Sequence, residues 1–311
     1  MADSAKQNSN LYSDLKELVS FRFHVKQKKL KHQQNLLAHH SGEHTAMKKG
    51  RGMTFSEVRQ YQPGDDIRHI DWRVTARTQK THTKLFVEEH ERPTILVTEQ
   101  TPNLFFGSQV RLKAAQAMNI SAVLAWVSLQ QNERVGGLSF NHLSHSWVSP
   151  KRNQQTVLHY LQKSVDLQQQ LSRPESPNNQ AWPKNLQHLL KLNKPGNKVF
   201  LIGDMIQLAD NAAAELLQLN KTADISAIHI YDPLEKQLPE LGWLTMTPSF
   251  QSDKVLKLDS FRQQTRQAYS ELYQQQWHNT QEQFSKLAIP LVDIGTHQEP
   301  IMALIQQQLL Q

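Results

Sequence analysis

Between Arg59 and Arg77 the sequence concentrates side chains that could do ionic or acid–base chemistry around a Pro63-Gly64 turn. The stretch holds four arginines and three aspartates: Arg59, Asp65, Asp66, Arg68, Asp71, Arg73 and Arg77. A planar guanidinium can bind both oxygens of a carboxylate, so this composition predicts a fixed ion-pair network that acts as a structural clasp. The alternative is a metal-dependent hydrolase or nuclease, whose carboxylates would be Asp65, Asp66, Asp71 and Glu88.

A second group of polar side chains follows the ends of short apolar runs. Glu99, Thr101 and Asn103 follow the run at 94–98, and Asp204 follows the run at 198–202. In open α/β sheets, ligands bind at the carboxyl ends of the strands, where these side chains would meet. Their oxygens are of the kind that Mg²⁺ and Ca²⁺ take, so the sequence predicts a magnesium or calcium site. The alternative is that these residues cap the turns and helices that follow them.

The elements that must position these side chains alternate between strand and helix patterns. Apolar, β-branched runs predict buried strands at 94–98, 135–140, 198–202, 225–231 and 289–294, and periodic stretches predict helices at 109–129, 154–170 and 302–310. A long helix after Asp259 carries aromatic residues from Phe261 to Phe284, which we interpret as core. The alternation predicts an α/β fold, a doubly wound, mainly parallel sheet of Rossmann type covered on both faces. The proline-rich stretch 172–183 is expected to be a loop.

The N-terminal segment carries most of the net charge. Residues 1–52 hold ten lysines and arginines against four acids, which gives +6 of the chain's +7. Apolar residues recur at helical spacing from Leu11 to about Ala38, which predicts a basic helical arm. Five of its cations could contact an anionic partner, either nucleic acid or a membrane surface: Arg22, Lys26, Lys28, Lys29 and Lys31. The alternative is a solvated helix face that covers part of the domain.

Composition and missing motifs exclude several classes of function. There is no cysteine, so disulfides and thiol nucleophiles are excluded, and a metal site must use histidine or oxygen ligands. Neither a Gly-x-Ser-x-Gly elbow nor a P-loop lysine motif occurs, and we therefore expect no enzymatic activity. No apolar run reaches the length of a membrane span and the N-terminus lacks a signal-peptide core, so the expected location is the cytoplasm.

The charged stretch also carries a family likeness. The run Tyr61-x-Pro63-Gly64-Asp65-Asp66-x-Arg68-x-Ile70-Asp71-Trp72, followed by Ala76-Arg77 and Glu88-Glu89, resembles the signature of the bacterial family called domain of unknown function 58. The likeness continues through Val135–Phe140 and Tyr231-Asp232-Pro233 and covers residues 40 to 311. It implies a von Willebrand factor A-like core, a cytoplasmic location and a partnership with MoxR-type AAA+ ATPases.

The resemblance also implies a particular metal site, from which this sequence departs. In von Willebrand factor A domains, a metal-ion-dependent adhesion site is built on Asp-x-Ser-x-Ser with a threonine and an aspartate from other loops. Glu99, Thr101 and Asn103 stand at the first three positions, and only Asp204 matches. Glutamate is one methylene longer than aspartate, and Mg²⁺ demands near-ideal geometry. The resemblance therefore leaves two alternatives, a site with altered ligands or a degenerate site held by hydrogen bonds.

These observations predict three parts: a basic helical arm at 1–45, a signature segment at 46–92 packed on the core, and a von Willebrand factor A-like domain at 93–311. The leading interpretation is a non-enzymatic interaction module that binds a protein partner at its strand-end surface. The resemblance implies that it acts with a MoxR-type AAA+ ATPase in the assembly or maturation of other proteins. No specific binding of nucleic acid is expected, and peripheral membrane contact stays open.

Overall fold

A computed structural model describes residues 12–31, 53–63, 65–88, 92–171, 179–246 and 255–311. The chain divides into two compact units, one spanning residues 42–91 and the other formed by residues 1–41 and 92–311. Each unit has its own sheet structure. Among the described residues, no helix is both long and apolar enough to cross a membrane.

The smaller unit is a two-stranded antiparallel ribbon with two short helical turns between its strands. Strand β1 (Met53–Gln60) pairs with β2 (His82–Glu88), and η1 (Ile67–His69) and α4 (Trp72–Thr78) lie in the connection. Both turns begin at an aspartate whose carboxylate accepts backbone N–H groups, Asp66 for η1 and Asp71 for α4. These are ordinary N-caps, since an aspartate oxygen satisfies amides that have no helical partner.

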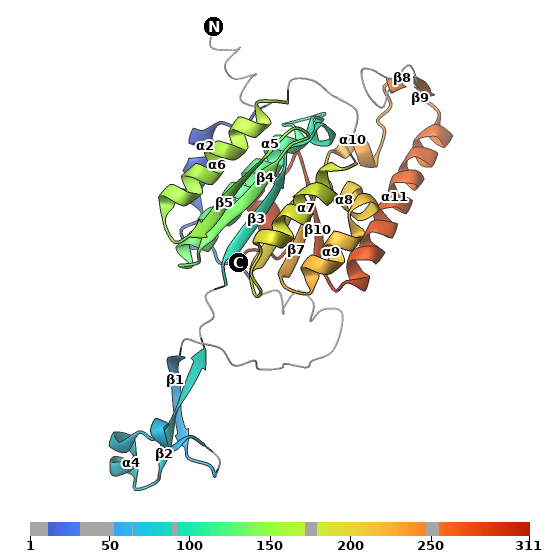
Figure 1. Ribbon diagram of the computed structural model, residues 1–311. Helices are drawn as coiled ribbons and strands as arrows, with labels where there is room; N and C mark the ends of the chain where they lie inside the picture. The colour runs from blue at the N-terminus through green and yellow to red at the C-terminus, as the bar shows by residue number, and fades with distance from the viewer. Residues whose placement is uncertain (1–11, 32–52, 64, 89–91, 172–178, 247–254) are drawn as a thin grey trace. The chain divides into compact units, whose positions relative to one another are not determined.

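The larger unit is built on a six-stranded sheet in the order β10-β7-β6-β3-β4-β5 (Figure 1). Its strands are β3 (Thr94–Glu99), β4 (Val135–Phe140), β5 (His145–Lys151), β6 (Lys198–Gly203), β7 (Asp224–Tyr231) and β10 (Leu291–Gly295). All neighbours run parallel except β5, an antiparallel edge strand. The order reverses between β3 and β6, which makes their carboxyl ends the topological switch point. The predicted doubly wound, mainly parallel α/β fold is confirmed.

Helices cover both faces of this sheet, because alternate strand residues point to opposite sides. On one face, α2 (Leu15–His24), α5 (Lys113–Gln130), α6 (Gln154–Gln168) and α12 (Pro300–Gln306) pack in one apolar cluster. On the other, a second cluster holds α7 (Ala181–Leu192), α8 (Met205–Asn211), α9 (Ala213–Asn220) and α11 (Gln263–Lys286). Leu96 belongs to the first cluster and its neighbours Ile95 and Val97 to the second.

Short elements complete the carboxyl edge of the sheet. The turn η2 (Pro102–Leu104) follows β3, and α10 (Pro233–Lys236) follows β7. An antiparallel ribbon of β8 (Trp243–Met246) and β9 (Leu256–Asp259) then leads into α11, as Figure 1 shows. Since α11 returns the chain toward the start of β10, the β8–β9 ribbon belongs to the carboxyl edge.

Three expectations were wrong. The helix predicted from Leu11 to about Ala38 ends at His24, because Leu30 forms a β-bridge with Leu310 and residues 25–31 are not helical; residues 32–38 lie outside the described part. The expected loop 172–183 ends in helix α7, which accepts Pro183 because a first-turn proline lacks only an unneeded N–H. Phe261 is exposed rather than core, whereas Phe284 is buried.

Candidate functional site

The end of β3 places two of the predicted site residues side by side. Glu99 is fully buried, and its Oε1 accepts a 2.5 Å hydrogen bond from the Thr101 hydroxyl. Its Oε2 accepts from the backbone N–H of Asp204 at 2.7 Å and from Trp182 Nε1 at 3.1 Å. A Cβ on Gly203 would lie 2.6 Å from the Glu99 Cβ, so this close approach requires glycine. Both oxygens of Glu99 are therefore already occupied by donors.

Asp204 joins Glu99 from the neighbouring strand end. It follows β6 and is the N-cap of α8, where its Oδ1 accepts from the backbone N–H groups of Ile206 and Gln207 at 3.1 and 3.3 Å. Asn103 does not join this group: within the described part of the chain its buried Oδ1 has no hydrogen-bond partner. The structure thus brings together Glu99, Thr101 and Asp204 of the four predicted residues.

The sequence interpretation missed the cation of the site, which is Lys113. Its side chain is 1% exposed, and Nζ lies 2.9 Å from Glu235 Oε1 and 3.6 Å from Asp204 Oδ2. Lys113 opens α5, a helix in which it is the one charged residue among eighteen. That lone lysine at the start of an otherwise uncharged helix was the available signal, because a buried lysine needs acidic partners. We call Glu99, Thr101, Lys113, Asp204 and Glu235 the strand-end cluster.

Two further residues of the site also went unpredicted. Trp182 lies in the first turn of α7, is 2% exposed and packs edge-on against Phe140 at 4.9 Å. His229 on β7 is buried, accepts from the backbone N–H of Met205 at 3.1 Å and stacks on Trp277 at 5.0 Å. Because Nδ1 accepts, the neutral imidazole carries its proton on Nε2. Nothing in the sequence marked either residue, since each is defined by contacts with distant segments.

Burial and charge set the protonation states of the cluster. Burial, and then the negative charge of Asp204, raise the pKa of Glu99 to about 7. Burial alone would raise the pKa of Asp204 too, but the ammonium of Lys113, the neighbouring His229 and the backbone N–H groups of Gln207 and Ile206 together outweigh it and hold that pKa below its ordinary value. Burial opposes the charge of Lys113, yet Glu235 and Asp204 together raise its pKa above the usual range. Near neutral pH, Lys113 is therefore a permanent cation facing two carboxylates.

The arrangement of these side chains does not fit a divalent ion. Both oxygens of Glu99 and one of Asp204 already accept hydrogen bonds, and the remaining Asp204 oxygen faces Lys113. Across the described ranges, no three histidine, aspartate or glutamate side chains are grouped so that they could hold a metal. The magnesium or calcium site stays a prediction without support from these contacts.

Asp232, at the end of β7, is the third acidic strand end and acts as a brace. Its carboxylate accepts from the backbone N–H of Ser108 at 2.9 Å and from the Thr296 hydroxyl at 2.7 Å. It also begins α10 through a capping box with Glu235. Asp232 therefore ties three loops of the carboxyl edge together and leaves no open oxygen ligand toward solvent.

The ion-pair network predicted for the signature stretch is smaller than expected. Arg59 and Asp65 form a close pair at 2.7 Å, whereas Arg68 and Asp66 are 3.9 Å apart and largely exposed. Asp71 pairs with Lys84 at 3.6 Å instead of with an arginine. Asp66 and Asp71 chiefly cap helical turns, because backbone amides two or three residues away are nearer than any guanidinium. In the described residues, Arg73 and Arg77 form no ion pair.

Asp65 and Asp71 are also two of the carboxylates that the hydrolase alternative requires. The backbone N–H of Gln62, and then Arg59, keep the pKa of Asp65 below its ordinary value. The backbone N–H of Val74 does the same for Asp71, with a further contribution from Lys84. Neither carboxylate is a group that would hold a proton near neutral pH as a general acid must. The side chain of Glu88 lies outside the described side chains, and the hydrolase interpretation stays a prediction.

The predicted anion-contacting residues lie on and after α2. Arg22 and Lys26 flank the ring of Phe23, which is 55% exposed, at 4.4 and 5.8 Å from its centroid. Lys29 and Lys31 donate backbone N–H groups to the last residues of the chain, Gln311 and Leu309. Lys28 lies in the turn between these two groups. Anionic-surface binding by this segment stays a prediction.

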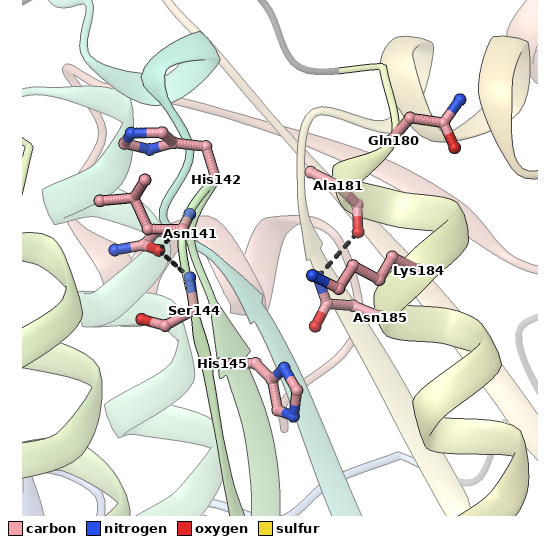
Figure 2. Close-up of a pocket in the computed structure, with 9 residues that line it drawn as sticks. Asn141, His142, Ser144, His145, Gln180, Ala181, Lys184 and Asn185 are labelled. Atoms are coloured by element: carbon pink, nitrogen blue, oxygen red, sulfur yellow. Dashed lines mark hydrogen bonds between the residues drawn. The ribbon is translucent and has the colours of Figure 1, made fainter.

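A small pocket of about 150 Å³ lies beside the turn between β4 and β5 (Figure 2). Asn141 anchors this turn by accepting from the backbone N–H of Ser144 at 2.8 Å, and Asn185 donates to the Ala181 carbonyl at 2.8 Å. His145 and Lys184 complete two of its walls, as Figure 2 shows. None of the predicted site residues lines the pocket, so it is separate from the strand-end cluster.

Solved structures with a related outline are distant. BatB from Bacteroides thetaiotaomicron, a conserved hypothetical protein, is 15% identical with a TM-score of 0.35, and the match covers 63% of this chain and 98% of that one. The SpRpn10 VWA domain is 12% identical with a TM-score of 0.33, over 70% of this chain and 94% of its own. At such TM-scores neither likeness carries an argument about function.

Curated relatives are found in mycobacteria. The uncharacterized proteins Rv1480 of Mycobacterium tuberculosis and Mb1516 of Mycobacterium bovis are each 26% identical over 203 residues, which is 65% of this chain. The match spans 62% of the length of these relatives. The family described as protein of unknown function DUF58 matches residues 57–279, which include the signature stretch and the strand-end cluster. The chain therefore belongs to the DUF58 family.

Proposed function

We propose that the chain is a non-catalytic protein-interaction module whose partner docks at the carboxyl edge of the six-stranded sheet. The observation that carries this proposal is a group of large apolar side chains exposed there. Trp243 is 71% and Phe261 66% exposed, and Leu241 is exposed beside them. We call these three residues the edge patch. Exposed apolar groups that adjoin one another mark surfaces that bind other proteins.

Backbone pairing makes the edge patch continuous. Trp243 on β8 stands opposite Asp259 on β9, and the backbone N–H of Ser260 donates to the Gly242 carbonyl at 2.8 Å. These bonds bring Phe261 beside Gly242, where an added Cβ would lie 3.0 Å from the Phe261 ring. The apolar side chains therefore share one short ribbon and the turn that begins α11.

The edge patch belongs to the same edge of the sheet as the strand-end cluster. The chain leaves the carboxyl end of β7, passes through α10 and enters β8, as Figure 1 shows. Glu235, the closest partner of Lys113, lies in α10 itself. A partner on the edge patch would thus sit at the end of the sheet where open α/β folds bind their ligands.

The chemistry of the cluster favours binding over catalysis. Glu99 and Lys113 are 0% and 1% exposed, so a substrate atom would have no access to either group. A general base or nucleophile must come within hydrogen-bond reach of the atom on which it acts. The cluster is therefore suited to hold three loops in place beneath a docking surface.

The partner class in this proposal is a MoxR-type AAA+ ATPase, with a role in the assembly or maturation of other proteins. The choice of this partner class and role rests on the family resemblance and on the apolar character of the edge patch. Aromatic residues such as tryptophan contribute disproportionately to protein interfaces, which makes Trp243 and Phe261 the expected anchors.

The test is capture of the ATPase from native lysate by wild type and by Trp243→Glu and Phe261→Glu. Each charged variant should retain roughly a tenth of the captured ATPase or less, because a buried hot-spot side chain is lost and a charge is introduced. Leu217→Glu is the matched control, since Leu217 is also apolar and exposed but lies on α9. Equal capture by all four proteins would exclude the edge patch, and capture of other proteins but no ATPase would exclude the partner class.

A further inference from the structure

Lys113 has an unusual position for a lysine. It is one of the largest fully buried side chains of the chain, and its ammonium lies between carboxylates from two different strand connections. Asp204 follows β6 and Glu235 follows β7, whereas Lys113 opens the helix after β3. The three segments that meet at the switch point of the sheet are thus joined through one nitrogen atom.

The charges around this nitrogen require a cation. Asp204 is 14% exposed at its side chain and Glu235 28%, so water screens them poorly. A buried carboxylate without a positive partner loses its hydration without compensation, which is strongly destabilising. In adhesion-type sites of the fold, a divalent ion supplies this positive charge at the carboxyl ends of the strands.

Here the chain supplies that charge itself. Lys113 Nζ contacts the one Asp204 oxygen that caps no helix, and the other Asp204 oxygen is held by Ile206 and Gln207. We infer that Lys113 is the resident cation of the strand-end cluster, that it takes the place of a divalent metal, and that the folded carboxyl edge needs no metal ion. This inference concerns the cluster alone and holds whichever partner binds the edge patch.

The first test uses the full wild-type chain and the metals themselves. Thermal unfolding and calorimetric titration are measured with MgCl₂, CaCl₂ or MnCl₂ at millimolar concentration and with EDTA. We expect the same Tm under all conditions and no saturable heat from any of the three cations. A Tm that rises with one of them and falls with EDTA, or a saturable heat of binding, would overturn the inference.

The second test removes the ammonium. Lys113→Ala should lower the Tm by roughly 5–10 °C, because Asp204 and Glu235 then face each other without a counter-charge. Lys198→Ala is the matched control: Lys198 also forms a close pair, with Glu133, but at the start of β6 and with 16% of its side chain exposed. The Tm of this control variant should fall by about 2–4 °C, because the carboxylate of Glu133 loses its partner but stays partly hydrated.

The two variants also separate the resident cation from an ordinary ion pair. Millimolar MnCl₂ should restore part of the Tm lost by Lys113→Ala and none of that lost by Lys198→Ala, because only the first leaves several acidic oxygens around one space. Equal Tm losses for both variants, or no difference in their response to MnCl₂, would contradict a cation role. If Lys113→Ala does not fold, the wild-type titrations still decide the question.

Discussion

The strand-end cluster and the signature stretch at 59–77 hold similar side chains and use them in opposite ways. In the cluster, Glu99 binds the backbone N–H of Asp204, which lies 105 residues further along the chain. In the signature segment, Asp66 and Asp71 bind amides two and three residues away. Long-range bonds between buried groups fix a tertiary arrangement, whereas local bonds at the surface fix only the start of a helical turn.

A high density of charged residues along the sequence is therefore no measure of how much those residues stabilise the fold. Exposed pairs such as Arg68 with Asp66 are screened by water and contribute little. Removing one charged side chain of a buried cluster leaves its partners with neither a counter-charge nor hydration, which is strongly destabilising. Charged side chains that are sparse in the sequence and meet inside the protein are therefore the more sensitive ones.

The largest expected difference comes from two aspartates with the same local role. Asp204 and Asp66 are both N-caps, but only Asp204 also faces a buried cation. Asp204→Ala should lower the free energy of unfolding by roughly 3–5 kcal/mol, because it leaves Lys113 underpaired. Asp66→Ala should cost about 1 kcal/mol or less, the value of a lost cap. Urea denaturation followed by circular dichroism measures both.

Asp204→Asn refines this comparison. The amide oxygen of asparagine can still accept from Ile206 and Gln207, so the cap is kept while the charge is lost. We expect Asp204→Asn to lose most of the unfolding free energy that Asp204→Ala loses. Full stability of Asp204→Asn would show that the cap, and not the ion pair with Lys113, is what Asp204 contributes.

The second prediction concerns pH and the buried carboxyl of Glu99. Its pKa is about 7 in the folded protein against an ordinary 4.5. Between these values the unfolded chain has lost the proton that the folded protein keeps, so the free energy of unfolding falls as pH rises. His229 acts in the opposite direction, because burial lowers its pKa from 6.5 to about 4 and the unfolded chain binds the extra proton. The two contributions oppose each other between pH 4.5 and 6.5.

Glu99→Gln separates these contributions. Glutamine can accept from Asp204 and Trp182 and donate to the Thr101 hydroxyl, so its hydrogen bonds can match those of the protonated acid. Relative to wild type, the variant should gain on the order of 3 kcal/mol in unfolding free energy as pH rises from 4.5 to 7, and then level off. Denaturant titrations across this range give the difference directly. A difference that stays constant with pH would mean that Glu99 is ionised in the folded protein throughout.

The sequence predicts the sheet well because each central strand is a short apolar run that needs no knowledge of its neighbours. Helix α5 is equally plain, since its apolar residues recur at helical spacing and nearly all of its residues are buried. Errors arose where a distant segment decides the outcome. The pairing of Leu30 with Leu310 ends the N-terminal helix early, and no local pattern announces it.

The residues of the candidate site also divide into those that sequence patterns and topology predict and those that contacts between distant segments decide. Glu99, Thr101 and Asp204 were found because strand ends of open α/β sheets converge by topology. Lys113 was missed because its partners come from the turn after β6 and from α10, and the meeting of these segments is decided by the packing of the whole edge. Asn103 shows that topology places a residue near a site without fixing its hydrogen bonds, since within the described residues its buried Oδ1 has no partner.

The smallest expected effect comes from Asp71 in the signature segment. Its contribution to stability is lost as pH falls, whereas the contribution of Glu99 is lost as pH rises. Hydrogen bonds from the Val74 amide, and then the charge of Lys84, hold the pKa of Asp71 below its ordinary 3.8, so its contribution exists above pH 3.8 and is lost as pH falls through the lower folded value. Asp71→Ala should speed hydrogen exchange above pH 3.8 at the amide of Thr75 in α4 and at that of its C-cap residue Gln79, and leave the α5 amides unchanged. Faster exchange in α5 to the same degree would mean that the signature segment supports the sheet, which is the clasp role that its charge density first suggested.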